Sequence, residues 1–554
     1  MVHPKLTDSG AGDALFENPP VLTDGNDKGK VLLVVGAGGF THAVPVLEIG
    51  RILAHRGHQV EFATHQGNEK WVNTPYYSAI SKVHLMGPDL TPEEEAQQYR
   101  DLQTSDPRVS YKGYFKPKYT VDKFWTSDYR YLQEIHAECK PDMIIADFFV
   151  DAVRDVGYPH SDTPVAMVWP QMPYGMAGVS YIPGVPGLQI DVLSSEHASF
   201  WARFRAELRP LRAAPAMIQY IRWVRKMRRA AGVNEGLPLR KKPNYLALVN
   251  SFWGLETPKD LPPLIAAVGP ILPDEYPPLD GPTEAFMANH RRVVYVSFGT
   301  HIQLGPEHLE RFLTAFSALF REDLIDGIIW AANDEQRRVF SSIDAAKLVP
   351  GGARYITRSD VDDIVNNRTP EWYFTPFAPQ RAILDRPETV LFVTHGGGSS
   401  VNEAMFHGVP MLSLGFFFDQ PLNGLRIVES GVGLAMDKAA FTETEMAEKC
   451  RAVLADEDGS FGLNVTRMKH IARVASKRKH HAADLVEEVM YDRKYGSKTG
   501  RPWHLETADM RMSAWRARNW DLTAFGSVLF AGMVGIGYYA FKYRSLIARF
   551  RWKW

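Results

Sequence analysis

The sequence predicts an α/β protein with two Rossmann-like parallel-sheet domains that face each other across a cleft, followed by a C-terminal transmembrane helix. Three observations predict this architecture. Short apolar runs typical of buried strands alternate with helical patterns in both halves of the 554-residue chain. A proline-rich stretch separates the two halves, and 20 consecutive uncharged residues lie near the C-terminus. The length suits two large domains, since a domain usually takes about 100–200 residues.

The first domain is expected over residues 30–270, after a polar extension at 1–29. Lys30–Val35 has the pattern of a buried strand, a helical pattern follows over Pro45–Arg56, and Gln59–Thr64 has the pattern of a second strand. A strand–helix–strand unit of this kind predicts a parallel sheet. Further strands of the same sheet are expected within Pro141–Phe149, Pro164–Trp169 and Asn244–Asn250.

A linker at 271–290 is expected to join this domain to a second one at 291–455. Prolines in Ile271–Pro282 favour an extended conformation for the first part of the linker. Residues 456–521 are predicted to form helices that return toward the first domain. Strands of the second sheet are expected at Arg292–Phe298, Gly327–Ala331 and Val390–Thr394.

Charge and cysteine content exclude several classes of protein. With 63 Lys and Arg against 64 Asp and Glu, the net charge is −1, so a globally basic nucleic-acid binder is excluded and no nucleic-acid partner is expected. The two cysteines, Cys139 and Cys450, are too few for a disulfide framework and match no metal-ligand spacing. The oligomeric state stays open.

The uncharged segment Leu522–Phe541 is long enough to cross about 30 Å of hydrocarbon. A basic tail at 542–554 follows it, with Trp552 and Trp554 suited to a membrane interface. The segment is therefore predicted to be a single-pass membrane anchor, and a buried core helix is the alternative.

The orientation of this anchor rests on opposing signals. The basic tail favours the cytosolic side, whereas the polar residues 1–30 lack a signal-peptide pattern and favour a cytosolic catalytic part. We expect the second arrangement, in the membrane of the endoplasmic reticulum. A lumenal chain could instead use the glycosylation sequons at Asn367 and Asn464.

The stretch Phe200–Ala230 carries nine basic residues and one acid, Glu207. Its apolar residues recur at helical spacing, and Pro210 and Pro215 are expected to divide it into two short helices. Two interpretations stay open. The pair could cover the core with a solvated charged face, or it could rest on anionic membrane lipid beside the cleft.

A glycine-rich turn follows the first strand, at Gly36-Ala-Gly38-Gly39. A dinucleotide-binding turn would have glycine at the position of Thr41, and an acid near the end of the second strand, where Thr64 stands. A nicotinamide-dependent oxidoreductase is therefore disfavoured.

A second glycine-rich turn fits a diphosphate better. The strand ending at His395 is followed by three glycines, and a helix is expected from Ser399. Free N–H groups at a helix N-terminus bind anions, Ser399 and Ser400 can donate to phosphate oxygens, and Glu403 can accept hydrogen bonds from a ribose diol. Taken alone, this turn could also be a plain tight loop.

The residues from Phe377 to Gln420 resemble the donor-binding signature of the UDP-glycosyltransferases. Resemblance extends to Val294–Thr300, Leu248–Ser251 and Thr41–Pro45, and the C-terminal span is similar to that of the membrane-anchored branch. It implies a two-domain GT-B fold. The matching pieces are Pro379-Gln380, Thr394–Gly397, Ser400, Glu403, Gly408–Pro410 and Asp419-Gln420.

This resemblance implies roles for the donor-site residues. Phe377 would stack on uracil in place of the usual Trp, and Ala378 and Gln380 would contact the same base. Glu403 would bind the ribose. Asp419 and Gln420 would bind the hydroxyls of a hexose, with glucose favoured, whereas Gly398 and Ser399 depart from the plant pattern and leave the sugar open. Thr300, His395 and Ser400 would bind the diphosphate. Gly397 and Ser399, at the start of the predicted helix, are expected to join them.

The resemblance also implies a catalytic pair. His42 would be the general base, and Asp147, at the end of a predicted strand, would orient it; capping of the next helix is the alternative role for Asp147. No metal and no cofactor besides the UDP-sugar are expected. The pair Asp360 and Asp362 is interpreted as part of a solvated loop.

The predicted function is inverting transfer of a hexose from a UDP-sugar to a hydroxyl of a small lipophilic acceptor. Membrane lipid is an expected partner, and loops such as Met172–Gln189 are expected to shape the acceptor pocket. The alternative is a catalytically silent UDP-sugar-binding subunit of a membrane glycosyltransferase complex.

Overall fold

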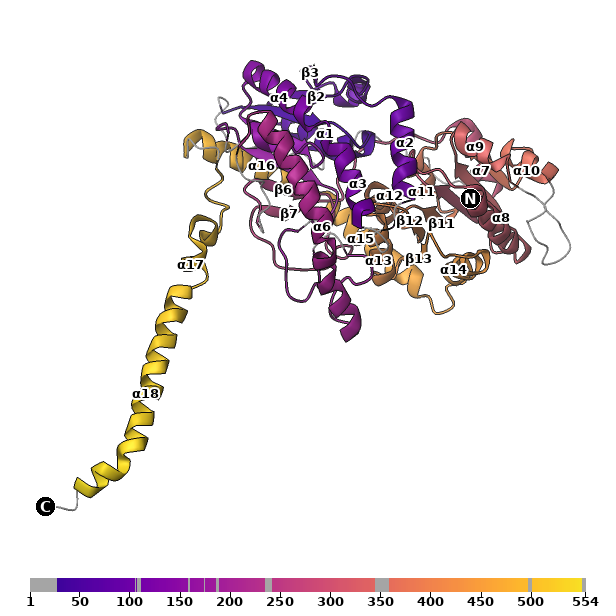
Figure 1. Cartoon of the computed structure of the whole chain (residues 1–554). Helices are drawn as coiled ribbons and strands as arrows, with labels where there is room; N and C mark the ends of the chain where they lie inside the picture. Colours follow the sequence, from indigo (N-terminus) through magenta and orange to yellow (C-terminus); the bar gives the residue numbers. More distant parts are fainter. Residues whose placement is uncertain are drawn as a thin grey trace.

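The computed structural model shows two α/β units and a helix that projects away from them (Figure 1). Most of the polar extension at 1–29, parts of Met172–Gln189 and the last four residues of the basic tail lie outside the described residues. The structure describes residues 27–104, 106, 111–157, 160–173, 175–185, 189–234, 242–343, 358–496 and 501–550.

A seven-stranded parallel sheet forms the first unit, in the order β3-β2-β1-β4-β5-β6-β7. The strands predicted here are confirmed, and β1 and β2 have the predicted bounds. The short strands β3 and β7 have too few residues for a pattern to identify them. The bounds are β1 Lys30–Val35, β2 Gln59–Thr64, β3 Lys82–Leu85, β4 Met143–Asp147, β5 Val165–Trp169, β6 Leu246–Val249 and β7 Ile265–Ala267.

A six-stranded parallel sheet forms the second unit, in the order β10-β9-β8-β11-β12-β13. Its three predicted strands are β8, β9 and β11, and the sequence analysis missed the other three. The bounds are β8 Val293–Ser297, β9 Gly327–Ala331, β10 Trp372–Thr375, β11 Thr389–Thr394, β12 Met411–Gly415 and β13 Gly433–Asp437.

Helices cover both faces of each sheet, as parallel sheets require. Each sheet therefore lies between two hydrophobic cores. The helices are α1 Phe40–His55, α2 Pro92–Gln103, α3 Tyr111–Asp122, α4 Trp125–Cys139, α5 Val153–Val156, α6 Phe200–Ala230, α7 Gly281–Asn289, α8 Pro306–Arg321, α9 Asp334–Phe340, α10 Arg358–Val365, α11 Gln380–Leu384, α12 Gly398–His407, α13 Gln420–Glu429, α14 Glu443–Ala455, α15 Ser460–Ser476, α16 Arg478–Tyr495, α17 Ala514–Ala517 and α18 Trp520–Phe550.

Helix α1 begins five residues before the predicted start at Pro45. Gly38 and Gly39 both have positive φ, so the chain can turn sharply after β1 and enter the helix at Phe40. Pro45 lies inside the helix, where it removes one backbone hydrogen bond. The buried inner face of α1 compensates for this loss, and His42 consequently lies in the first turn.

Helix α6 is continuous, and the prediction of two short helices was wrong. Pro210 and Pro215 lie inside it. Both ends of α6 are fixed, because the Ser199 hydroxyl accepts a hydrogen bond from the amide of Ala202, and Arg228 forms a buried ion pair with Asp155. These contacts keep the helix intact across the two prolines.

The structure has helices in the second part of the linker, for which no element was predicted, and in the segment interpreted as a solvated loop. The second part of the linker forms α7, with Asp280 as its N-cap. Asp360 and Asp362 lie in α10, not in a loop, because Val361 between them is buried in the core of the second unit. Ile364 and Val365 are buried in the same core, so α10 has one apolar face, but three apolar residues among charged ones give too weak a period to be recognised.

Helix α16, from near the C-terminus, packs on α1 of the first unit. Its apolar side chains Ala482, Val486 and Met490 are buried in the core beneath α1. Glu487 forms a hydrogen bond with His58, 2.7 Å long, and an ion pair with Arg56. The chain thus crosses back over the first sheet after completing the second.

Helix α18 leaves the body and projects alone (Figure 1). Its segment Trp520–Arg544 has a mean hydropathy of 1.5 in its most apolar window, none of which is buried. By length and composition, it is the one helix in the described part of the chain that could cross a membrane.

A buried ion pair between α16 and α1 generates a stability prediction. Lys479 donates to fully buried Glu48 at 3.1 Å. Lys479→Met removes the cation and leaves a buried carboxylate less compensated, so the melting midpoint of the full chain should fall by about 5 °C or more. Thermal unfolding in detergent micelles measures this, with exposed Lys70→Met as the control. An equal melting midpoint in the two variants would contradict a stabilising role for the ion pair between Lys479 and Glu48.

Candidate active site

His42 and Asp147 meet at the carboxyl edge of the first sheet. His42 lies in the first turn of α1 directly after β1, and Asp147 ends the adjacent strand β4. Nδ1 of His42 lies 2.9 Å from Oδ1 of Asp147. The His42 side chain is 22% exposed, whereas that of Asp147 is 3% exposed. The pair is thus buried on the carboxylate side and open on the imidazole side.

The surroundings of His42 fix the plane of its ring. Its ring stacks on Phe149, with centroids 4.7 Å apart, and Phe149 also donates its backbone N–H to Oδ2 of Asp147 at 2.9 Å. A Cβ on Gly38 would lie 2.6 Å from the His42 ring, so only glycine leaves room for the imidazole at this turn. Both oxygens of Asp147 therefore have a partner.

The charge environment makes His42 more basic. Burial alone would lower the pKa of His42, but the charge and hydrogen bond of Asp147, together with the charge of Asp419, raise the pKa above its usual 6.5. Asp419 belongs to the second unit. The basicity of His42 therefore depends on residues from both sides of the cleft.

His395 lies at the carboxyl edge of the second sheet, directly after β11. It is enclosed by two glycines, because a Cβ on Gly397 would lie 2.4 Å from its Nε2 and one on Gly299 would lie 3.2 Å from its Cε1. Burial, with a smaller contribution from the charge of His301, lowers the pKa of His395 to about 4. At neutral pH it is an uncharged imidazole that can donate one N–H.

The structure brings together three residues of the predicted nucleotide site. Nε2 of Gln380 donates to Oε2 of Glu403 at 2.7 Å and to the Ser400 hydroxyl at 3.3 Å. Burial raises the pKa of Glu403, against the hydrogen bond from Gln380 and the charge of Arg381. Gln380 and Glu403 therefore form one polar unit beside the first turn of α12.

Other predicted donor-site residues differ in how accessible they are. Ala378 is buried, Ser399 is half-buried, and Thr300 is exposed. The Phe377 ring is 74% exposed, so a base could approach its face directly.

Asp419 and Gln420 join α13 to the start of α12. Oδ2 of Asp419 accepts hydrogen bonds from the amide of Gly398 at 3.1 Å and from the side chain of Asn423 at 2.9 Å. Oε1 of buried Gln420 accepts from the amides of Phe416 and Phe417. These contacts fix the orientation of both side chains.

Two groups of residues at the cleft were missed by the sequence analysis. Arg426 of α13 forms a buried ion pair with Glu256 and donates to Gln171 at 3.1 Å, which ties the second unit to the first. His301 stacks on Tyr99 of α2, with centroids 3.9 Å apart. His301 follows Thr300 directly, so its place in the motif could have identified it, whereas the distant partners of Arg426 carry no local signal.

Among the described residues, no group of three or more His, Cys, Asp and Glu side chains is placed to hold a metal ion. Asp360 and Asp362 lie on α10, remote in sequence from either strand edge that carries the site.

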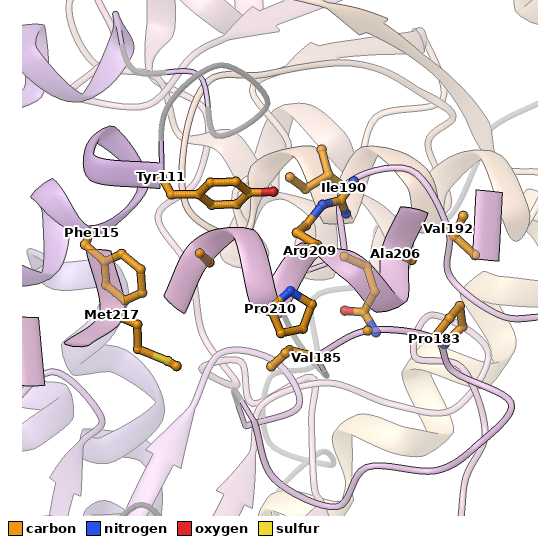
Figure 2. Close-up of a pocket in the computed structure, with 13 residues that line it drawn as sticks. Tyr111, Phe115, Pro183, Val185, Ile190, Val192, Ala206, Arg209, Pro210 and Met217 are labelled. Atoms are coloured by element: carbon orange, nitrogen blue, oxygen red, sulfur yellow. The ribbon is translucent and has the colours of Figure 1, made fainter. Parts of the chain in front are cut away.

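An apolar cavity of about 130 Å³ lies between α6, α3 and the segment before α6 (Figure 2). Figure 2 shows Tyr111 and Phe115 of α3 near Met217 of α6, with Arg209 and Pro210 between them and Val192. Ion pairs hold its two helices to the segment after Asp147: Lys118 of α3 contacts Asp151, and Arg228 of α6 contacts Asp155. The remaining lining includes Pro183, Val185, Ile190, Ala206 and Ala213.

Comparisons with known proteins place this geometry in a family. The model of the family described as UDP-glucoronosyl and UDP-glucosyl transferase matches residues 241–498. UDP-glycosyltransferase FPY2 of Fusarium mangiferae is 38% identical over 541 residues, covering 92% of this chain and 97% of that protein. The chain belongs to the UDP-glycosyltransferase family. A UDP-glycosyltransferase of Talaromyces amestolkiae is 40% identical over 522 residues, covering 91% of this chain and 96% of that protein.

Solved structures confirm the fold of this UDP-glycosyltransferase. The glycosyltransferase of kitacinnamycin aligns with a TM-score of 0.55 at 19% identity, covering 83% of this chain and 99% of that one. A UDP-glucosyltransferase from Polygonum tinctorium aligns with a TM-score of 0.52 at 18% identity, covering 83% and 99% of the two chains. The transferase therefore has the predicted GT-B fold, and it is an enzyme that transfers a sugar from a UDP-sugar.

The tight fit around His395 generates a prediction for nucleotide binding. Gly397→Ala places a methyl group on the imidazole and should weaken UDP binding about tenfold or more, because relieving the overlap displaces His395 or the turn. Isothermal titration of the full-length transferase with UDP measures this. Gly281→Ala, where a Cβ meets no atom within 4 Å, is the control. Equal affinities for the two variants would exclude the fit at His395 as a determinant of UDP binding.

Proposed function

We propose that this UDP-glycosyltransferase transfers a hexose, with inversion at the anomeric carbon, to a hydroxyl of a small lipophilic acceptor. The observation that carries the proposal is the 2.9 Å contact between His42 and Asp147, which leaves the imidazole 22% exposed and close enough to Asp419 of the second unit for that charge to raise the pKa of His42. A protein that only bound the donor would need no oriented base at this place.

In the proposed mechanism, Nδ1–H of His42 donates to Asp147 and leaves Nε2 as the base. Nε2 takes the proton of the acceptor hydroxyl while its oxygen forms a bond to C1 of the hexose. The bond between C1 and the diphosphate oxygen breaks, and UDP leaves with the electron pair. Asp147 stabilises the imidazolium, as the raised pKa of His42 supports.

The leaving diphosphate is assigned to the first turn of α12. The amide of Gly398 donates to Asp419, but the other amides at this helix N-terminus favour negative charge, and Ser399, Ser400 and Thr300 can add hydroxyl donors. Neutral His395 contributes an N–H without a charge, in keeping with its lowered pKa. The turn at Gly397 lets the diphosphate approach the backbone.

The uracil and the hexose of the donor are assigned to residues on either side of this turn. Uracil stacks on the exposed ring of Phe377 and meets Ala378 and Gln380, while Glu403 accepts hydrogen bonds from the ribose. Asp419 accepts hydrogen bonds from the hexose, and Nε2 of Gln420 donates, since its Oε1 is held by backbone amides. Glucose is the proposed hexose.

The acceptor is proposed to be lipophilic, and α18 to anchor the enzyme in the membrane of the endoplasmic reticulum with its catalytic part in the cytosol. The apolar cavity and the exposed apolar helix support a lipid-soluble acceptor. The side-chain amide of Asn367 donates to and accepts from the backbone of Phe374, so glycosylation of this sequon is disfavoured on either side of the membrane.

Removal of the base tests the mechanism. His42→Ala should lower hexose transfer on the order of 10³-fold or more and leave UDP affinity within a factor of about two. Transfer of labelled glucose from UDP-glucose to extracted membrane lipids, together with UDP titration, measures both. Exposed His481→Ala is the control. Normal transfer by His42→Ala would contradict the role of His42, and absence of transfer by the unaltered enzyme would favour a donor-binding subunit.

The pH profile tests the contact with Asp147. Because Asp147 raises the pKa of His42, kcat/KM should fall on acidification with a midpoint above 6.5. Asp147→Asn removes the charge that stabilises the imidazolium, so the midpoint should move to lower pH and kcat should fall on the order of 10²-fold or more. Asp128→Asn, which alters another buried His–Asp pair at His65, should leave the midpoint in place. An unshifted midpoint in Asp147→Asn would contradict the proposal that Asp147 raises the pKa of the catalytic base His42.

A further inference from the structure

The outer face of α6 carries a stripe of large apolar side chains that face solvent. They recur over the first five turns at the spacing of one helix face. Trp201 is 66% exposed and Leu211 is 70% exposed, values unusual for side chains of this size. The stripe consists of Phe200, Trp201, Phe204, Leu208, Leu211 and Ile218.

The opposite face of the same turns of α6 packs toward the body of the enzyme. Ala206, Pro210, Ala213 and Met217 line the apolar cavity, and Val224 continues this inner face into the core. The stripe is therefore not the core-facing side of an amphipathic helix. The first half of α6 is apolar on both sides, and its outer side has no partner within the described residues.

Basic side chains accompany the stripe. Arg203, Arg205 and Arg212 flank it and are exposed. Farther along the helix, the same outward direction carries basic residues in place of apolar ones. The exposed residues there are Arg222, Arg225, Lys226 and Arg229. The one acid of α6, Glu207, accepts a hydrogen bond from the amide of Gly184.

Apolar side chains bordered by arginine are complementary to one kind of surface, the headgroup region of an anionic bilayer. Aliphatic and aromatic groups enter the acyl boundary there, while guanidinium groups stay with the phosphates. The same chain has a helix long and apolar enough to cross a membrane. In the view of Figure 1, one end of α6 protrudes from the lower side of the body, and α18 extends toward the lower left. A protein partner would not require this ring of positive charge.

We propose that the first five turns of α6 lie in the surface of an anionic phospholipid bilayer, as a second membrane contact beside α18. This inference rests on the proposed anchoring by α18 and adds an orientation to it. The helix then forms the wall between the bilayer and the apolar cavity, since one face lines the cavity and the other enters the lipid. An acceptor dissolved in the bilayer reaches the cavity around α6 without crossing water.

A depth-sensitive label on the full-length enzyme tests the proposal. Cys139 and Cys450 are buried, so a cysteine added at the surface can be labelled alone with an environment-sensitive fluorophore. We compare Leu211→Cys with Leu463→Cys, which is 72% exposed on α15 and serves as the matched control. Both variants are reconstituted in vesicles of phosphatidylcholine and phosphatidylserine, with or without brominated acyl chains.

The label at 211 should shift to shorter wavelength and lose more than half of its intensity to brominated lipid, while the label at 463 changes little. Vesicles of phosphatidylcholine alone, or the combined change Arg203→Gln, Arg205→Gln and Arg212→Gln, should weaken the quenching at 211 severalfold. Flotation reports α18 separately. If the enzyme floats with the vesicles but the label at 211 stays in water, the membrane contact of α6 is wrong and the anchoring by α18 stands. If the enzyme does not float, both the contact of α6 and the anchoring by α18 are wrong.

Discussion

The hydrogen bond between Nδ1 of His42 and Asp147 is the interaction on which the site depends. It exists because β1 and β4 are neighbours in a parallel sheet, so that the residues after their carboxyl ends lie side by side. Gly38 leaves the space that the imidazole occupies, and Phe149 holds both members of the pair. The bond engages Nδ1, which leaves Nε2 for the proposed role as base, and it raises the pKa of His42.

The second constraint is a buried ion pair that holds the two units together. Arg426 and Glu256 are both buried, and each charge would be costly without the other. Their ion pair holds α13, which begins next to Asp419, against the first unit near Gln171. Asp419 in turn accepts from the first amide of α12. The turn proposed to bind the diphosphate is therefore connected to the unit that carries His42 through a short series of buried contacts.

The proposed reaction brings three groups together: a water-soluble nucleotide sugar, an apolar acceptor, and a histidine that acts as general base. The turn proposed to bind the donor belongs to the second unit, whereas the apolar cavity belongs to the first. Ion pairs from α3 and α6 to the segment after Asp147 connect that cavity to the proposed catalytic pair. In the proposal, α6 provides the link between a lipid phase and this arrangement.

The sequence by itself determined the elements whose signal is local. Local strand patterns predicted β1, β2 and β9 with their observed bounds, and the ordered motif from Phe377 to Gln420 indicated the family. Tertiary structure decided the rest, because it depends on contacts between distant residues. Packing kept α6 continuous across Pro210 and Pro215, and burial of Val361, Ile364 and Val365 in the second core made α10 helical. The pairing of Arg426 with Glu256 and the stacking of His301 on Tyr99 arise only when the two sheets meet, since neither pair shares a local pattern.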